Sequence, residues 1–138
     1  MKKFILLSCL LFASLVSFAQ AKTNSQYLFI IRFKADFKPA SDEAVKTNIK
    51  HWQEYMGNLI QSGSLVIGYR PATEGLTISG NEKALKSTPY VANGELVSSV
   101  MVIKAVDMDA AKAIADKCPV FEFGGTIEVR PLMETAAR

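Results

Sequence analysis

The segment SDEAVKTNIKHWQEYMGNLIQS at residues 41–62 sets the fold, because its apolar residues recur with the period of an amphipathic helix. They form one stripe along the helix: Val45, Ile49, Trp52, Met56, Leu59 and Ile60. Ser41 or Asp42 can cap the start, and Gly63 stands where a left-handed C-terminal cap belongs. We therefore predict a helix over 41–62 whose stripe packs against the rest of the domain.

Strands are predicted on both sides of this helix. Residues 27–33 are rich in aromatic and β-branched side chains and are apolar on both faces, which is typical of a strand covered on two sides. After the helix, residues 65–70 indicate a second strand and 75–79 a weaker third, which ends in a turn at 79–81. Residues 80–96 lack periodicity, so we expect a loop or an irregular hairpin at the open end of the sheet.

The second half repeats this order of elements. Residues 97–106 have the pattern of a long apolar strand. Asp107 can cap a short helix over 108–117, and Pro119 ends that helix. A last strand is predicted over 126–132.

The order strand, helix, strand, hairpin, strand, helix, strand is that of a split βαβ, ferredoxin-like α+β sandwich, with two helices on one face of an antiparallel sheet. Such a sheet leaves its second face bare, and the strands at 27–33 and 97–106 put apolar side chains on that face. A large exposed apolar face is rare on a monomer. We therefore expect a homodimer that closes face to face into a dimeric α+β barrel.

Residues 1–21 have the form of a cleavable bacterial secretory signal. Lys2 and Lys3 make a short basic start, an apolar run follows, and small residues permit cleavage after Ala19 or Ala21. The apolar run, about 13 residues, is short for a membrane span, which needs roughly 20. An uncleaved membrane anchor remains one alternative, and lipid attachment at Cys9 is another.

Cleavage predicts a periplasmic or secreted protein that has no contact with the membrane afterwards. We expect a disordered leader at 22–26 and one domain over 27–134. The mature chain then holds a single cysteine, Cys118, so no internal disulfide can form. Its stability must come from apolar burial, from oligomerisation, or from both.

The charge and residue inventory argues against several classes of function. The chain has 16 Lys+Arg and 13 Asp+Glu, and loss of Lys2 and Lys3 with the signal leaves 14 − 13 = +1, which does not support a basic nucleic-acid surface. One histidine and two cysteines cannot build a His-rich or an all-cysteine metal site. Phosphate-loop, dinucleotide, zinc-protease and lipase motifs are missing from the sequence. We expect no metal and no cofactor.

Three blocks of the mature chain carry a resemblance. They are His51-Trp-Gln-Glu-Tyr-Met with Gln61-Ser-Gly-Ser-Leu-Val-Ile-Gly68, then Asp107 to Pro119, then Gly125-Thr-Ile-Glu-Val-Arg-Pro131. In this order and spacing they are similar to the YCII-related family, including its branch named for an Asp-Gly-Pro-Phe motif, over about residues 27–132. The resemblance implies a ferredoxin-like dimeric α+β barrel, usually of unassigned biochemical function, with a helix histidine suspected as catalytic.

Two positions depart from that family's pattern. Ser87-Thr88-Pro89-Tyr90 stands where the branch has Asp-Gly-Pro-Phe, and Cys118-Pro119 stands where related members have Asp-Pro. The loss of these two acidic residues leaves the candidate histidine without an evident acidic partner. A secretory signal is also atypical of the family.

His51 is the first candidate catalytic residue, because histidine titrates near neutrality and can act as general acid or base. On the helix it flanks the apolar stripe together with Asn48 and Tyr55. All three are therefore expected at the rim of the helix–sheet contact, where a cleft can open towards residues 70–96. Tyr55 can donate a hydrogen bond to a substrate oxygen. The alternatives are a solvated surface histidine and a tyrosine that only packs.

Four further residues are candidate substrate ligands. Ser98 and Ser99 begin an otherwise apolar strand, where hydroxyls can orient a ligand; alternatively, they satisfy neighbouring backbone groups. Arg70 and Arg130 each precede a proline at a strand end and can bind a carboxylate in bidentate fashion; alternatively, each pairs with an acidic side chain. Cys118 is expected to be an inert, packed thiol, since a helix C-terminus does not lower a thiol pKa.

Two functions from different classes fit these residues. In the first, the protein is a small exported enzyme without a cofactor, of isomerase, lyase or oxygenase-like type, in which His51 moves a proton and Tyr55 or a serine holds the substrate. In the second, it is a non-catalytic binding or accessory dimer that holds a small-molecule ligand in the same cleft. The surroundings of His51 distinguish these functions from a plain surface histidine.

Overall fold

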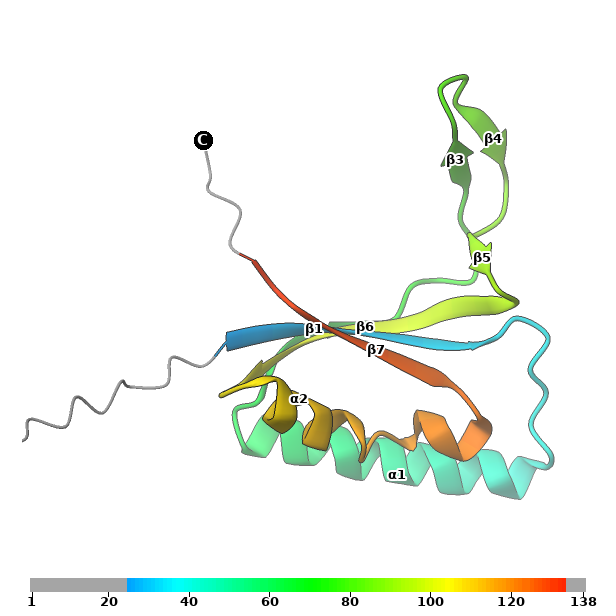
Figure 1. Cartoon of the computed structure of the whole chain (residues 1–138). Helices are drawn as coiled ribbons and strands as arrows, with labels where there is room; N and C mark the ends of the chain where they lie inside the picture. Colours follow the sequence, from blue (N-terminus) through cyan, green and yellow to red (C-terminus); the bar gives the residue numbers. More distant parts are fainter. Residues whose placement is uncertain (1–24, 134–138) are drawn as a thin grey trace, which may run out of the picture.

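Two long neighbouring strands, β1 and β6, form the centre of the fold. The computed structural model describes residues 25–133, so the predicted signal at 1–21 and the first part of the predicted leader lie outside the described residues. The elements follow in this order (Figure 1): β1 (Ser25–Lys34), α1 (Asp42–Gln61), β2 (Leu65–Tyr69), β3 (Thr77–Ser79), β4 (Ala84–Lys86), β5 (Val91–Ala92), β6 (Glu95–Ala105), α2 (Met108–Ala115), the 3-10 helix η1 (Pro119–Phe123) and β7 (Thr126–Pro131).

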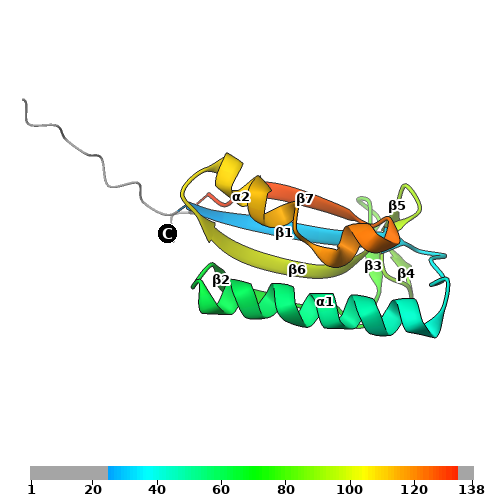
Figure 2. The same cartoon turned by 90° about the horizontal axis from the view of Figure 1, so that it is seen from below.

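The main sheet has the strand order β2-β6-β1-β7, and every neighbouring pair is antiparallel. Both helices cover the same face of this sheet, where α1 and the α2–η1 segment lie side by side (Figure 2). This arrangement confirms the predicted α+β, ferredoxin-like split βαβ sandwich. Ser25 and Gln26, expected in the frayed leader, instead begin β1 and pair with Ala105 and Lys104.

The core lies between the sheet and this helical layer. Its largest fully buried side chains are Phe29 and Ile31 from β1, Ile103 from β6 and Val120 from η1. Phe29 pairs with Met101 across the β1–β6 ladder, so their side chains share the covered face. Because side chains alternate along β1 and β6, one set of apolar side chains packs against the helices and a second set lies on the opposite face of the sheet.

Both ends of α1 follow the prediction. The Ser41 side chain accepts a hydrogen bond from the backbone N–H of Ala44, as an N-cap does. At the other end Gly63 adopts φ +68°, and the N–H of Ser64 donates to the carbonyl of Leu59, which is the Schellman arrangement. The chain can therefore turn back into β2 after a three-residue connection, residues 62–64.

The buried face of α1 differs from the predicted apolar stripe. Ile49 and Ile60 are 51% and 64% exposed, whereas Asn48 and Tyr55, expected at the rim, are buried. The physical reason is that α1 contacts η1 and the end of α2 beside it as well as β2. Its buried arc consequently turns towards that neighbour.

Most of the segment between β2 and β6 departs from the main sheet, although β5 within it pairs with β6. The third strand, predicted over 75–79, is formed by residues 77–79 and pairs with β4 in a separate two-stranded sheet. The turn predicted at 79–81 is present, since Gly80 has φ +71°. Figure 1 shows this hairpin on the side of the sheet opposite to α1 and α2, so the irregular hairpin is confirmed but stands off the sheet face.

The second face of the main sheet, which we call the open face, has an apolar centre. Cross-strand partners Leu28 and Val102 lie there, as do Ile30 and Val100, and all four are half-buried. Among residues 25–133, no helix is both long and apolar enough to cross a membrane.

Candidate functional site

His51 is paired with a carboxylate that the sequence did not reveal. Its Nδ1 lies 2.7 Å from Oε1 of Glu122, which the 3-10 helix η1 presents to α1. An ionised carboxylate can only accept, so the Nδ1–H of His51 donates this hydrogen bond to Glu122. Nε2 is then the unprotonated nitrogen of the neutral ring. Both side chains stay accessible, at 43% and 40% exposed.

Asn48 holds Glu122 in place from one helical turn before His51. Its Nδ2 donates to Oε2 of Glu122 at 2.8 Å and to the carbonyl oxygen of Pro119 at 3.0 Å. The hydrogen bond from Asn48, with the bond and charge of His51, lowers the pKa of Glu122 below its usual value. Glu122 therefore remains an anion at neutral pH, suited to orient His51 and to stabilise its protonated form.

Local sequence explains why Glu122 reaches this position. Pro119 stands at the first turn of η1, where its missing N–H costs nothing, and Gly124 ends η1 with φ +67°. Gly125 then passes so close to the Arg32 carbonyl oxygen and the Val120 side chain that a Cβ would collide with both. These residues place η1 beside α1 in a single arrangement.

A groove of about 580 Å³ lies beside the His51–Glu122 pair, between α1 and the α2–η1 segment. His51, Tyr55 and Glu122 all line it, together with Lys117. Residues 70–96 do not contribute to its lining. The expected opening of a cleft towards that segment is therefore wrong, because the hairpin lies on the other side of the sheet.

Tyr55 lines the groove, but its side chain is buried in the core. It is 7% exposed, and its hydroxyl donates to the carbonyl oxygen of Ile114 at 3.2 Å. Burial raises the pKa of Tyr55 well above its ordinary value. The structure therefore gives this hydroxyl a packing role, the alternative considered above.

Cys118 is packed as predicted. It is 3% exposed, and burial raises the pKa of its thiol to about 11, with the nearby charge of Glu122 adding to the effect. A thiol of this kind is not a nucleophile at neutral pH.

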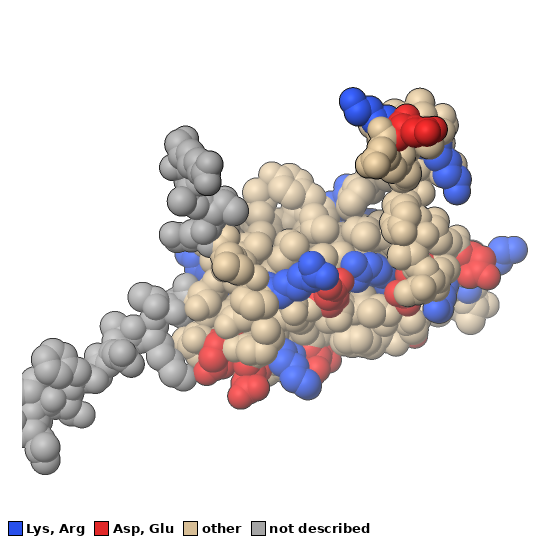
Figure 3. Space-filling model, turned by 45° about the horizontal axis from the view of Figure 1, so that its top comes forward, with Lys and Arg blue, Asp and Glu red and all other residues tan. Residues whose placement is uncertain are grey.

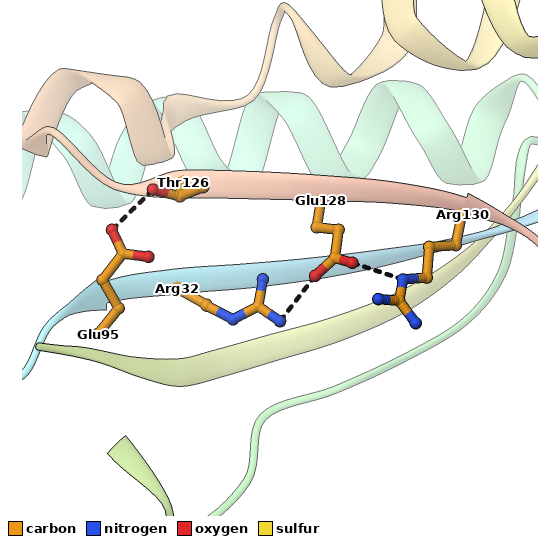
Figure 4. A network of polar contacts seen from close by, with 5 residues as sticks. All are labelled: Arg32, Glu95, Thr126, Glu128 and Arg130. Carbon is orange, nitrogen blue, oxygen red and sulfur yellow. Dashed lines mark hydrogen bonds and ion pairs between the residues drawn. The ribbon is translucent and has the colours of Figure 1, made fainter. Parts of the chain in front are cut away.

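The predicted substrate ligands do not join His51. Arg130 lies on the open face, where Glu128 bridges it to Arg32, and Arg32 Nη2 is 2.8 Å from Glu128 (Figure 4). These two arginines hold the pKa of Glu128 below its usual value. Arg70 is exposed just after β2. For Arg130, the structure thus shows the pairing with an acidic side chain.

The two serines lie inside β6 and do not begin it. β6 starts at Glu95, and its pairing with β1 shifts between Ile31 and Arg32, which leaves Ser98 in a bulge. The Ser98 hydroxyl donates to the carbonyl oxygen of Ile31 at 3.2 Å, while Ser99 pairs opposite Ile31. Ser98 therefore satisfies a backbone group beside the bulge.

Glu122 was missed because its signal in the sequence is weak. A single acidic residue in PVFEF gives no periodicity, and the short 3-10 helix was not predicted. Cys118 stands where the resemblance leads one to expect an aspartate, and in this chain the carboxylate comes instead from Glu122, four residues later. Within residues 25–133, no group of three or more His, Cys, Asp or Glu side chains is placed to hold a metal ion.

Comparison with known proteins assigns the family. The family model described as YCII-related domain matches residues 26–136. No curated protein matches the chain. A crystal structure titled as a dimeric ferredoxin-like protein from an uncultured marine organism is similar, with 10% identity, a TM-score of 0.33, and coverage of 85% of this chain and 95% of that one. Since the family match extends over most of its length, the chain belongs to the YCII-related domain family.

Proposed function

We propose that the protein is a small-molecule enzyme in which His51 transfers a proton within the groove. The 2.7 Å contact between His51 Nδ1 and Glu122 Oε1 carries this proposal. It leaves Nε2 as a base, while the carboxylate stabilises the imidazolium that forms. A histidine on a merely solvated surface needs no such partner, and Glu122 itself is held by a buried asparagine.

The groove favours an isomerase or lyase reaction among the types considered. Proton abstraction next to a carbonyl or carboxylate needs a base and a group that stabilises the developing negative charge. His51 supplies the base, and Lys117, which lines the same groove, supplies a cation. The substrate class that fits is a small anionic oxo acid or unsaturated acid.

Deuterium exchange tests this proposal without knowledge of the full reaction. A panel of 2-oxo, 3-oxo and unsaturated acids is incubated with the protein in D2O, and loss of the acidic C–H signals is followed by proton NMR. We expect faster exchange of at least one compound with the wild type than with His51→Ala. Thermal melting should be similar for both proteins, because the ring is 43% exposed.

The second candidate function is that of a ligand-binding protein without catalysis. The same panel of acids distinguishes it from the enzyme. Saturation-transfer NMR detects compounds that bind in the groove. Binding that depends on His51 without any exchange would favour the binding function. Equal exchange with the wild type and with His51→Ala would contradict the enzymatic proposal.

The imidazole itself offers a direct check, because His51 is the single histidine of the chain. For the neutral ring, ¹⁵N NMR should show a protonated Nδ1 and an unprotonated Nε2. Glu122→Ala removes the carboxylate oxygen that accepts from Nδ1 and should not preserve this tautomer. An unchanged tautomer in Glu122→Ala would remove the role assigned to the carboxylate.

Export and dimer formation complete the proposal. The signal-like segment at 1–21 supports export to the periplasm or beyond, and mass spectrometry of protein from its host should find Gln20 or Lys22 at the N-terminus. The apolar open face supports a homodimer, because Ile30 and Val100 at its centre are apolar side chains on the face away from the helices and are only half-buried. Light scattering at micromolar concentration should give a dimer mass.

A further inference from the structure

The hairpin formed by β3 and β4, residues 77–86, projects from the molecule; we call it the arm. Its strands form a sheet of their own, separate from the main sheet. Ile78 and Leu85 lie directly opposite each other on one face of the arm and are 60% and 66% exposed. Figure 3 shows the arm standing clear of the body, with charged side chains near its end.

An arm of this kind lacks the support that strands need. A two-stranded hairpin is at best marginally stable alone in water, and a third strand or a packing partner usually stabilises it. Here the apolar pair Ile78 and Leu85 faces solvent, as does Leu76 at the base, which is 61% exposed. The arm therefore has the chemistry of a surface that packs against another molecule.

The open face and the arm border the same space. The arm rises on the side of the sheet opposite to the helices, which is also the side of the open face (Figure 1). The apolar surface of that face extends from Leu28 and Ile30 of β1, across β6, to Ile67 and Tyr69 of β2. One body that fills this space would contact both the apolar face and the arm.

We infer that this body is a second copy of the chain and that each arm clasps the partner protomer. This inference rests on the proposed homodimer. The two apolar surfaces occur on one chain, so a two-fold axis satisfies both at once through a self-complementary interface. The carboxylates of the open face, Glu95 and Glu128, are already paired with Lys34 and Arg32. Within residues 25–133, the open face therefore presents no unpaired acidic patch that would call for a basic partner.

The length of the arm agrees with a clasp. The three residues of β3 extend roughly 10 Å at about 3.3 Å per residue, which matches the roughly 10 Å between stacked sheets. An arm that rises from one sheet can therefore reach the partner's sheet. It can hold the edge of the partner as well as its open face.

Sedimentation equilibrium of the purified protein and two variants tests the clasp. The double variant Ile78→Ser/Leu85→Ser removes the apolar pair, and we expect its dimer Kd to rise about 100-fold or more. The matched control Ala84→Ser/Lys86→Ser changes the other face of the same hairpin and should leave Kd within threefold. Circular dichroism should show the same folded domain in all three proteins.

The outcomes separate the clasp from the dimer itself. A dimeric wild type whose Kd is unchanged in Ile78→Ser/Leu85→Ser would overturn the clasp and leave the dimer standing. A wild type that is monomeric at 100 μM would overturn both. In a clasped dimer, hydrogen exchange of amides 77–86 should also slow as the protein concentration passes through Kd; exchange independent of concentration would contradict the clasp.

Discussion

Replacing Asn48 with alanine should destabilise the domain and loosen the candidate site together. The side chain is 6% exposed and makes two hydrogen bonds that connect α1 to η1. A bond to a neutral carbonyl, here that of Pro119, contributes about 1 kcal/mol, and one to a charged acceptor about 1.5–3 kcal/mol. Because Glu122 is 40% exposed, the lower end applies to its bond. Asn48→Ala should therefore cost about 2–3 kcal/mol.

Urea unfolding at one fixed protein concentration measures this loss, since a dimer makes apparent stability depend on concentration. Gln53→Ala is the matched control, because Gln53 is an exposed polar residue on the same helix, and its change should stay within about 0.5 kcal/mol. Asn48→Asp keeps the shape but removes both N–H donors and adds a carboxylate beside Glu122. It should be less stable than Asn48→Ala at pH 7 and should recover as the pH falls, when the two carboxyls can share a proton.

The reasoning fails if Asn48→Ala costs no more than Gln53→Ala. It also fails in part if stability falls as expected but the ¹⁵N signals of His51 keep the wild-type tautomer and exchange behaviour. That result would mean that Asn48 stabilises the helix contact without positioning Glu122.

Two further changes test the backbone and the charge at the site. Gly125→Ala should lower the free energy of unfolding, measured in urea, by about 3 kcal/mol or more, because the new Cβ would overlap Val120 and lie 2.7 Å from the Arg32 carbonyl oxygen. The control is Gly57→Ala in the middle of α1, where a Cβ meets nothing within 4 Å, and this change should be neutral or stabilising. Because the pKa of Glu122 is lowered in the folded state, its contribution is present above the unfolded value, about 4.3, and is lost as the pH falls through the folded value. Between pH 6 and pH 3, Glu122→Gln should therefore lose less stability than the wild type; equal losses would show that Glu122 is not coupled to folding.

The elements that carry strong periodicity were predictable. The helix at α1 with its Ser41 cap and its Gly63 end, the helix capped by Asp107, and the outer strands all lie where the sequence places them. Each depends on local chemistry, which a window of residues contains. His51 could be identified from its residue type and from its place in a block that resembles the YCII-related family. The groove beside it was expected to open towards residues 70–96, whereas it lies between α1 and the α2–η1 segment.

Contacts between distant segments decided the rest. By itself the sequence determines the order and type of the two helices and the four strands of the split βαβ, the apolar faces of β1 and β6, and the single histidine of the chain. Only the tertiary structure brings Glu122 to His51, 71 positions away, and turns α1 so that Asn48 is buried and Ile49 is exposed. The physical reason is that a helix buries whichever face its neighbours cover, and here η1, a short element without periodicity, is one of those neighbours.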